Sequence, residues 1–154
     1  MKTLVAYFSA EGATEKLAKE LADRIGADLF VIEPERPYTA EDISYMNPMA
    51  RCNREKFGNK DVPVIGRVEN FEDYELVLLG FPIWYRAAPN VVNTFCKAYD
   101  WSGKKTAAFA TSGGDGIGKT MEKLQPYTGG TVVDAKLVRT ADELVDWAKK
   151  LQDA

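Results

Sequence analysis

Histidine is absent from the 154 residues of this sequence. It is the side chain whose ordinary pKa lies closest to neutral pH, and it is a common general base and metal ligand. Its absence excludes Ser–His and Cys–His nucleophilic catalysis. We therefore predict no metal site and look for a function that needs no catalytic residue of the chain's own.

Cysteine is also scarce, with only Cys52 and Cys96 in the chain. Two cysteines do not make the disulfide framework of a small secreted domain, so a reducing compartment is the simplest setting. No apolar run is long enough to span a bilayer, and no small-residue cleavage site precedes the charged Glu11 and Glu15. We expect a cytoplasmic protein without a signal peptide and without membrane insertion.

Charge of the two signs is nearly balanced, with a formal net charge of −3. A slightly acidic chain is unsuited to nucleic acid, so we predict no nucleic-acid partner. Apolar residues make up 45% of the chain and charged residues 28%, which is the range of globular and not of disordered proteins. The length suits one domain with a full core, which we predict to span residues 1–154.

Short apolar segments alternate with helical patterns along the chain. The apolar segments have little polar alternation, which is typical of strands buried on both faces of a parallel sheet. The stretches between them carry apolar stripes at helical spacing. We predict an α/β fold, a five-stranded parallel sheet with helices on both faces. The expected strands are residues 4–8, 29–32, 74–81, 105–111 and 131–138.

Turn and capping residues mark the ends of the expected helices. Gly26 is suited to end the first helix, and Pro126 requires the fourth to end just before it. Thr140 and Glu143 match a capping box at the start of the last helix. The second strand is expected to be buried on both faces and to be ended by Pro34 and Pro37, before a long connection over residues 38–63 that contains one or two helices.

Three loops follow strands at the carboxyl edge of the predicted sheet, where ligands bind in folds of this kind. They are residues 9–14, 82–88 and 112–118. The first opens into a helix, whose unpaired N–H groups and macrodipole attract anions. Gly12 permits a close approach or a left-handed turn, and Ser9 and Thr14 add hydroxyl groups. A phosphate cradle and an ordinary capped turn both fit this stretch.

A competing motif lies in the third of these loops. Residues 113–120 read Gly-Gly-Asp-Gly-Ile-Gly-Lys-Thr and satisfy the P-loop pattern G-x-x-x-x-G-K-[ST]. Too little chain follows Thr120 for the strands and the magnesium-binding acid of a P-loop NTPase, for which Asp134 is a weak candidate. The alternative interpretation is that Lys119 and Thr120 begin a surface helix.

Three motifs taken together resemble the flavodoxin family, with bacterial short-chain flavodoxins as the best match. They are Ser-Ala-Glu-Gly-Ala-Thr at 9–14, Gly-Phe-Pro-Ile-Trp-Tyr at 80–85 and Thr-Ser-Gly-Gly at 111–114. Each motif is weak alone, but their order and spacing are fairly specific, and the likeness covers almost the whole chain. The resemblance implies a three-layer flavodoxin-like fold of strand order 2-1-3-4-5 and non-covalent FMN as cofactor.

The resemblance also implies which residues hold FMN. The first loop would bind the phosphate, Trp84 or Tyr85 would stack on the flavin ring, and the third loop would bind the pyrimidine edge with its backbone N–H groups. Tyr45 and Met46 either cover the other ring face or pack under their own loop. The predicted cofactor-binding residues are Ser9, Ala10, Glu11, Gly12, Ala13, Thr14, Pro82, Ile83, Trp84, Tyr85, Ser112, Gly113, Gly114, Asp115 and Gly116.

Glu11 departs from the family pattern, which has a hydroxyl residue at this place. A carboxylate aimed at a phosphate dianion would be repulsive. Three explanations are open: Glu11 turns outward, the affinity for FMN is reduced, or the ligand is a different one. We prefer the first.

The implied function is low-potential electron transfer by a monomer that exchanges electrons with two redox-partner proteins, a reductase and an electron acceptor. The flavin would do the chemistry, so no catalytic residue is predicted. The alternatives are an FMN-dependent NAD(P)H reductase of quinones or other small acceptors, a non-redox module that has lost FMN, and the P-loop NTPase.

Overall fold

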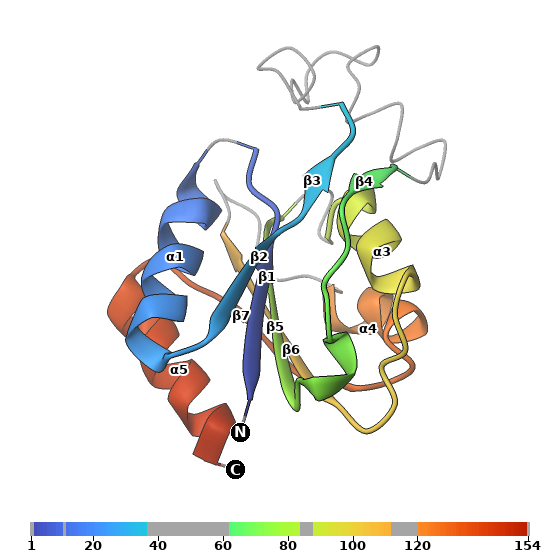
Figure 1. Ribbon diagram of the computed structural model, residues 1–154. Helices are drawn as coiled ribbons and strands as arrows, with labels where there is room; N and C mark the ends of the chain where they lie inside the picture. The colour runs from blue at the N-terminus through green and yellow to red at the C-terminus, as the bar shows by residue number, and fades with distance from the viewer. Residues whose placement is uncertain (1, 11, 37–61, 84–87, 112–119, 154) are drawn as a thin grey trace.

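The computed structural model describes residues 2–10, 12–36, 62–83, 88–111 and 120–153, and a five-stranded parallel sheet runs through its middle (Figure 1). The strands lie in the order β2-β1-β5-β6-β7, and every neighbouring pair is parallel. Counted along the chain, this is the predicted order 2-1-3-4-5, which is confirmed. The strands are β1 (Thr3–Tyr7), β2 (Asp28–Val31), β5 (Leu76–Pro82), β6 (Lys105–Thr111) and β7 (Val132–Leu137).

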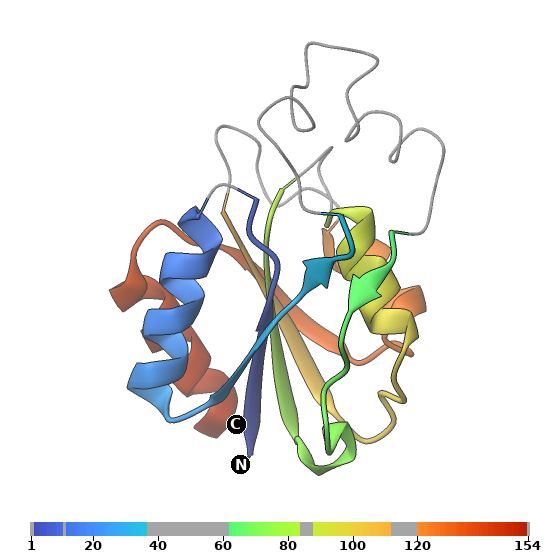
Figure 2. The same ribbon diagram turned by 45° about the horizontal axis from the view of Figure 1, so that its top comes forward.

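Helices cover both faces of the sheet, as predicted. α1 (Ala13–Ile25) and α5 (Ala141–Asp153) lie on one face, and α3 (Asn90–Lys97) and α4 (Thr120–Leu124) lie on the other (Figures 1 and 2). Each layer has its own apolar core. Leu21 and Val145 pack with Leu78 on the first face, and Phe95 and Leu124 pack with Leu79 on the second.

The middle strand β5 is the most deeply buried element of the sheet. Its residues from Leu76 to Phe81 are buried, because strands and helices surround it on every side. The near-continuous apolar sequence of this stretch reflects that position.

The outer strands differ from the prediction. Residues 29–32 were expected to be buried on both faces, but Leu29 is 39% and Val31 37% exposed, so that expectation is wrong. The physical reason is that β2 lies at the edge of the sheet with β1 as its neighbour, outside the full cover of the helices. Val133 of β7, at the other edge, is 55% exposed for the same reason.

Pro34 does not simply end the second strand. Glu33–Pro34 forms the short strand β3, which pairs antiparallel with β4 (Val64–Ile65) and makes a separate two-stranded sheet. The helices expected within residues 38–63 fall almost entirely outside the described residues.

The predicted helix ends are confirmed. Gly26 follows α1 with a φ of 68°, a left-handed conformation that glycine adopts without strain. α4 ends at Leu124, and Pro126 lies in the 3-10 turn η2 (Gln125–Tyr127). A second 3-10 turn, η1 (Phe71–Asp73), precedes β5. Thr140 Oγ1 accepts the N–H of Glu143 at 3.2 Å, as the capping motif requires.

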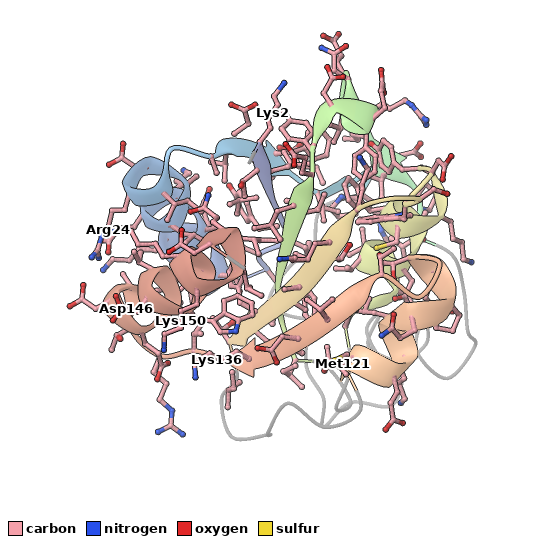
Figure 3. All side chains as sticks on the ribbon, turned by 90° about the horizontal axis from the view of Figure 1, so that it is seen from below. Lys2, Arg24, Met121, Lys136, Asp146 and Lys150 are labelled. Carbon is pink, nitrogen blue, oxygen red and sulfur yellow. The ribbon has the colours of Figure 1, made fainter. Side chains whose placement is uncertain are left out.

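An ion pair joins the two helices of the first face. Arg24, labelled in Figure 3, places Nη1 2.8 Å from Oδ1 of Asp142 at the start of α5 and 3.3 Å from Oε2 of Glu20. Both partners are exposed, so this contact adds little to stability beside the apolar packing of α1 on α5. Within the described ranges, no helix is long and apolar enough to cross a membrane.

Gly80→Ala is expected to destabilise the fold because the middle of the sheet has no room for a methyl group. A Cβ at Gly80 would lie 2.3 Å from Cζ of Phe109 on the neighbouring strand β6, and Phe109 is fully buried. We expect a loss of about 1–3 kcal/mol in the free energy of unfolding, measured by urea denaturation. Combined with Phe109→Leu, the loss should be smaller than the sum of the two single losses, because the ring is the obstacle. Additive losses would refute this explanation.

Candidate anion and cofactor site at the carboxyl edge of the sheet

The turn between β1 and α1 has the geometry of an anion site. Gly12 precedes the helix with φ 97° and ψ −14°, and its N–H donates to Ser9 Oγ at 3.0 Å. The helix then begins with the N–H of Lys16 donating to the carbonyl of Gly12 at 3.1 Å. The N–H groups of residues 13–15 therefore have no acceptor within the helix, and they point out of its positive end.

Gly12 leaves this turn open. Its φ of 97° is one that residues with a side chain rarely adopt, and a Cβ built on it would meet no atom within 4 Å. Gly12 and Ala13 are both exposed. The glycine predicted for this place is therefore needed for the backbone conformation, and a ligand can approach the backbone directly.

Thr14 faces the interior of the protein. It is 1% exposed, and its Oγ1 lies 2.8 Å from Oγ1 of Thr111 at the end of β6. The hydroxyl was expected to add a donor for a phosphate, and the structure instead pairs it with a second hydroxyl. What Thr14 presents at the positive end of the helix is its backbone N–H.

Hydrogen bonds join the ends of β1, β5 and β6, the strands that the three predicted loops follow, at one edge of the sheet. The N–H of Phe8 donates to the carbonyl of Gly80 at 2.9 Å, and the N–H of Ile83 donates to the carbonyl of Thr111 at 2.8 Å. Pro82 lies opposite Thr111 in the β5–β6 ladder. Figure 2 shows the ends of β1, β5 and β6 side by side at this edge. The structure thus brings the first loop and residues 82–83 together with Thr111 at the end of β6. The third predicted loop, residues 112–118, lies outside the described residues, so the gathering of all three loops stays a prediction.

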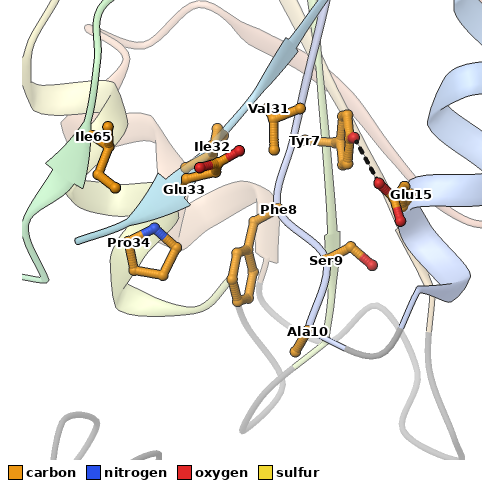
Figure 4. A pocket seen from close by; sticks show the side chains of 10 residues that line it. All are labelled: Tyr7, Phe8, Ser9, Ala10, Glu15, Val31, Ile32, Glu33, Pro34 and Ile65. Carbon is orange, nitrogen blue, oxygen red and sulfur yellow. Dashed lines mark hydrogen bonds between the residues drawn. The ribbon is translucent and has the colours of Figure 1, made fainter. Parts of the chain in front are cut away.

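A pocket of about 300 Å³ adjoins the first loop on the side of β2 (Figure 4). Its polar groups include the carboxylates of Glu15 and Glu33, which would repel an anion. A phosphate therefore fits the end of α1 and not this pocket. The lining residues are Tyr7, Phe8, Ser9, Ala10, Glu15, Val31, Ile32, Glu33, Pro34 and Ile65.

A flavodoxin family model matches residues 2–151 of the chain. This chain belongs to the flavodoxin family. No curated protein matches it. The matching segment includes the P-loop-like residues 113–120, which favours the flavodoxin interpretation over an NTPase.

Solved structures of flavoproteins are similar to this flavodoxin-family chain over nearly its whole length. The crystal structure of an inferred flavoprotein from Bacteroides eggerthii is 33% identical, with a TM-score of 0.90 and coverage of 99% of this chain and 98% of that one. The crystal structure of an inferred flavoprotein from Bacteroides uniformis is 32% identical, with a TM-score of 0.89 and coverage of 96% of this chain and 97% of that one. A flavoprotein from Lactobacillus acidophilus, solved in complex with FMN, shares the fold at 23% identity, with a TM-score of 0.74 and coverage of 96% and 98%.

Several predicted residues of this family member lie outside the described residues. They are Glu11, Tyr45, Met46, Trp84, Tyr85, Ser112, Gly113, Gly114, Asp115, Gly116 and Lys119. Their roles stay predictions. Thr120, the last residue of the P-loop-like motif, begins α4, whose residues 121–123 are exposed, so the expected surface helix is present. Thr120 itself is on the buried side of that helix.

Sequence reasoning missed two kinds of neighbour of the candidate site. Thr111 was quoted as part of a motif but not as a site residue, although its place at the end of a predicted strand was a usable signal. Glu33, Pro34 and Ile65 line the pocket because β3 pairs with β4. No local pattern announces a two-residue antiparallel pair, so these residues had no signal in the sequence.

Contacts hold the Glu15 carboxylate away from the open turn. Its Oε1 accepts the hydroxyl of Tyr7 at 3.4 Å, drawn as a dashed line in Figure 4, and lies 3.1 Å from Nζ of Lys19. Burial raises the pKa of Tyr7 from 10.0 to about 12, and the negative charges of Glu15 and Glu33 add to the rise. Tyr7 is therefore a neutral donor at every physiological pH.

Tyr7→Phe is expected to reduce the alkaline instability of the protein. A raised pKa means that the folded state favours neutral Tyr7, so its contribution to stability is complete below pH 10 and is lost as the pH rises toward 12. Urea unfolding across this range should show a smaller loss of stability in the variant than in the wild type. The pKa of Tyr74 is also raised to about 12, by burial and Asp28. Tyr74→Phe, at the far end of the sheet, should therefore reduce the loss of stability over the same pH range. An equally steep loss in Tyr7→Phe would contradict the assignment.

Proposed function

We propose that this protein binds FMN non-covalently at the carboxyl edge of its sheet and works as an electron carrier. The observation that carries the proposal is the meeting of the open turn at Gly12 with the ends of β5 and β6, fixed by the bonds of Thr111 to Thr14 and Ile83. A phosphate site and a neighbouring edge for a flat ring are what FMN requires. The L. acidophilus protein of the same fold, which binds FMN, supports the proposal.

The residues of the first loop fit a phosphate. The N–H groups of Ala13, Thr14 and Glu15 supply donors at the positive end of α1. The oxygen of the Ser9 hydroxyl accepts the N–H of Gly12, and its proton can still be donated to a phosphate. Glycine at position 12 keeps the approach clear. Pro82 and Ile83 would support the ring at the end of β5, beside the predicted Trp84 and Tyr85.

The chain's role in this function is to bind and orient. FMN, when bound, takes up and gives back electrons. The chain would fix the phosphate with backbone N–H groups, enclose the ring and leave one edge open to redox-partner proteins. The net charge of −3 would favour encounter with a basic partner.

FMN titration of the purified protein tests the proposal. We expect quenching of flavin fluorescence with one FMN bound per chain, and visible flavin bands that bleach with dithionite and return in air. A colourless protein that does not quench FMN fluorescence would refute it. Steady oxidation of NADPH without an added reductase would instead identify the protein as a reductase of small acceptors.

Ala13→Asp tests where the phosphate lies. Ala13 is exposed in the first turn of α1, where a carboxylate interacts favourably with the helix dipole, so the FMN-free protein should be as stable as the wild type or slightly more stable. The same charge should repel the phosphate and weaken FMN binding about tenfold at low salt, and less at high salt. Affinity is measured by fluorescence quenching and stability by urea unfolding.

Ala13→Asn is the matched control, since it has nearly the same shape without the charge. It should bind FMN about as well as the wild type. Equal weakening by both variants would show that the side chain's bulk, and not its charge, is responsible. FMN binding by Ala13→Asp as tight as that of the wild type would place the phosphate elsewhere.

A further inference from the structure

Thr111, the last residue of β6, bonds to residues of both the first and the second predicted loop of the proposed FMN site. Its side chain reaches back 97 residues along the sequence to Thr14, with 2.8 Å between the two Oγ1 atoms, and its carbonyl accepts the N–H of Ile83 at 2.8 Å. We propose that the Thr111 hydroxyl is a positioning residue for the FMN phosphate, acting through Thr14. This inference rests on the proposed function.

The first turn of α1 needs such an anchor. The buried residues of this helix are Thr14, Ala18, Leu21 and Ala22, so Thr14 is the only polar one among them and the only one in the first turn. Its neighbours Gly12 and Ala13 are exposed and pack against little. Apolar packing of Ala18 and Leu21 fixes the helix farther along, but it has no directional control over the turn where the helix begins.

The hydroxyl pair supplies that direction. A buried hydroxyl is costly without a hydrogen bond, and Thr14 is buried, so its bond to the half-buried Thr111 favours one placement of the turn on the end of β6. That placement fixes the backbone N–H of Thr14, one of the three donors at the end of the helix. Because hydrogen bonds weaken steeply as their angle closes, a small rotation of the turn would cost phosphate binding.

Thr111→Val tests the role of the Thr111 hydroxyl without changing the backbone. Valine keeps the shape and the β-branch of threonine, and it keeps the carbonyl that holds Ile83. Among the described residues, the side-chain bond that this variant removes is the one to Thr14. Riboflavin has the ring of FMN but lacks the phosphate. If Thr111 positions the phosphate site, the variant should lose affinity for FMN and keep its affinity for riboflavin. Damage to the whole site would weaken the binding of both.

The same strand offers a matched control at its other end. Thr106 of β6 is fully buried, and its Oγ1 lies 2.9 Å from Oγ1 of Thr131. Thr131 gives its one hydroxyl proton to the carbonyl of Thr128 at 2.8 Å, so Thr106 is the donor of the pair. Thr106→Val removes an equivalent threonine–threonine bond far from the carboxyl edge.

The experiment measures the dissociation constants of FMN and riboflavin by fluorescence quenching, together with urea unfolding of the FMN-free proteins. Thr111→Val should weaken FMN about fivefold and leave riboflavin within about twofold. Thr111→Ser, which restores the hydroxyl, should recover most of the FMN affinity. Thr106→Val should lose stability while it binds both flavins as the wild type does.

Thr14→Val removes the bond from the other side and keeps the backbone N–H. It should weaken FMN about as much as Thr111→Val, and the double variant should be no weaker than either, because all three lack the same bond. Thr14→Val also carries the test if Thr111→Val does not fold.

Two results overturn the positioning role while the proposed function stands. One is FMN binding by Thr111→Val as tight as that of the wild type, and the other is an equal loss of FMN and riboflavin. A wild-type protein that binds neither flavin would refute the proposed function itself, and the positioning role with it.

Discussion

The parallel pairing of β1, β5 and β6 is the constraint on which the rest of the structure depends. Parallel strands all end at the same edge, so the segments that follow them must meet there, whatever their separation in the sequence. Helices on both faces bury the sheet and make this pairing stable. The close fit of Gly80 to the ring of Phe109 shows how tightly the middle strands are packed. The proposed cofactor site thus lies at the end of the tightly packed middle strands of the sheet.

Electrostatics divides this edge into two regions. The open turn at Gly12 presents backbone N–H groups at the positive end of α1. The pocket beside it carries carboxylates, and Tyr7 and Lys19 hold Glu15 within that second region. An anion is attracted to one place and repelled from its neighbour, so the position of a phosphate follows from charge and not from the volume of the pocket.

Local sequence patterns predicted the elements of the fold well where packing matched local preference. The strand at residues 105–111 and the end of α1 at Gly26 were found because an apolar run and a helix-ending glycine are local signals. The prediction was wrong for residues 29–32, since an apolar run indicates a strand but not its place in the sheet. Pro34 was misread for a related reason, because its pairing with Val64 involves residues far away in the chain.

By itself, the sequence determined the fold class, the strand order expected of the family, and the open turn at Gly12, because each follows from residues that are close together in the chain or from motifs of known order. Only the tertiary structure decided that the Thr14 hydroxyl faces Thr111, that β2 is an exposed edge, and that Glu33 and Ile65 line a pocket. These outcomes depend on which distant segments become neighbours. Burial and hydrogen bonding between such segments are properties of the packed molecule, and no local pattern encodes them.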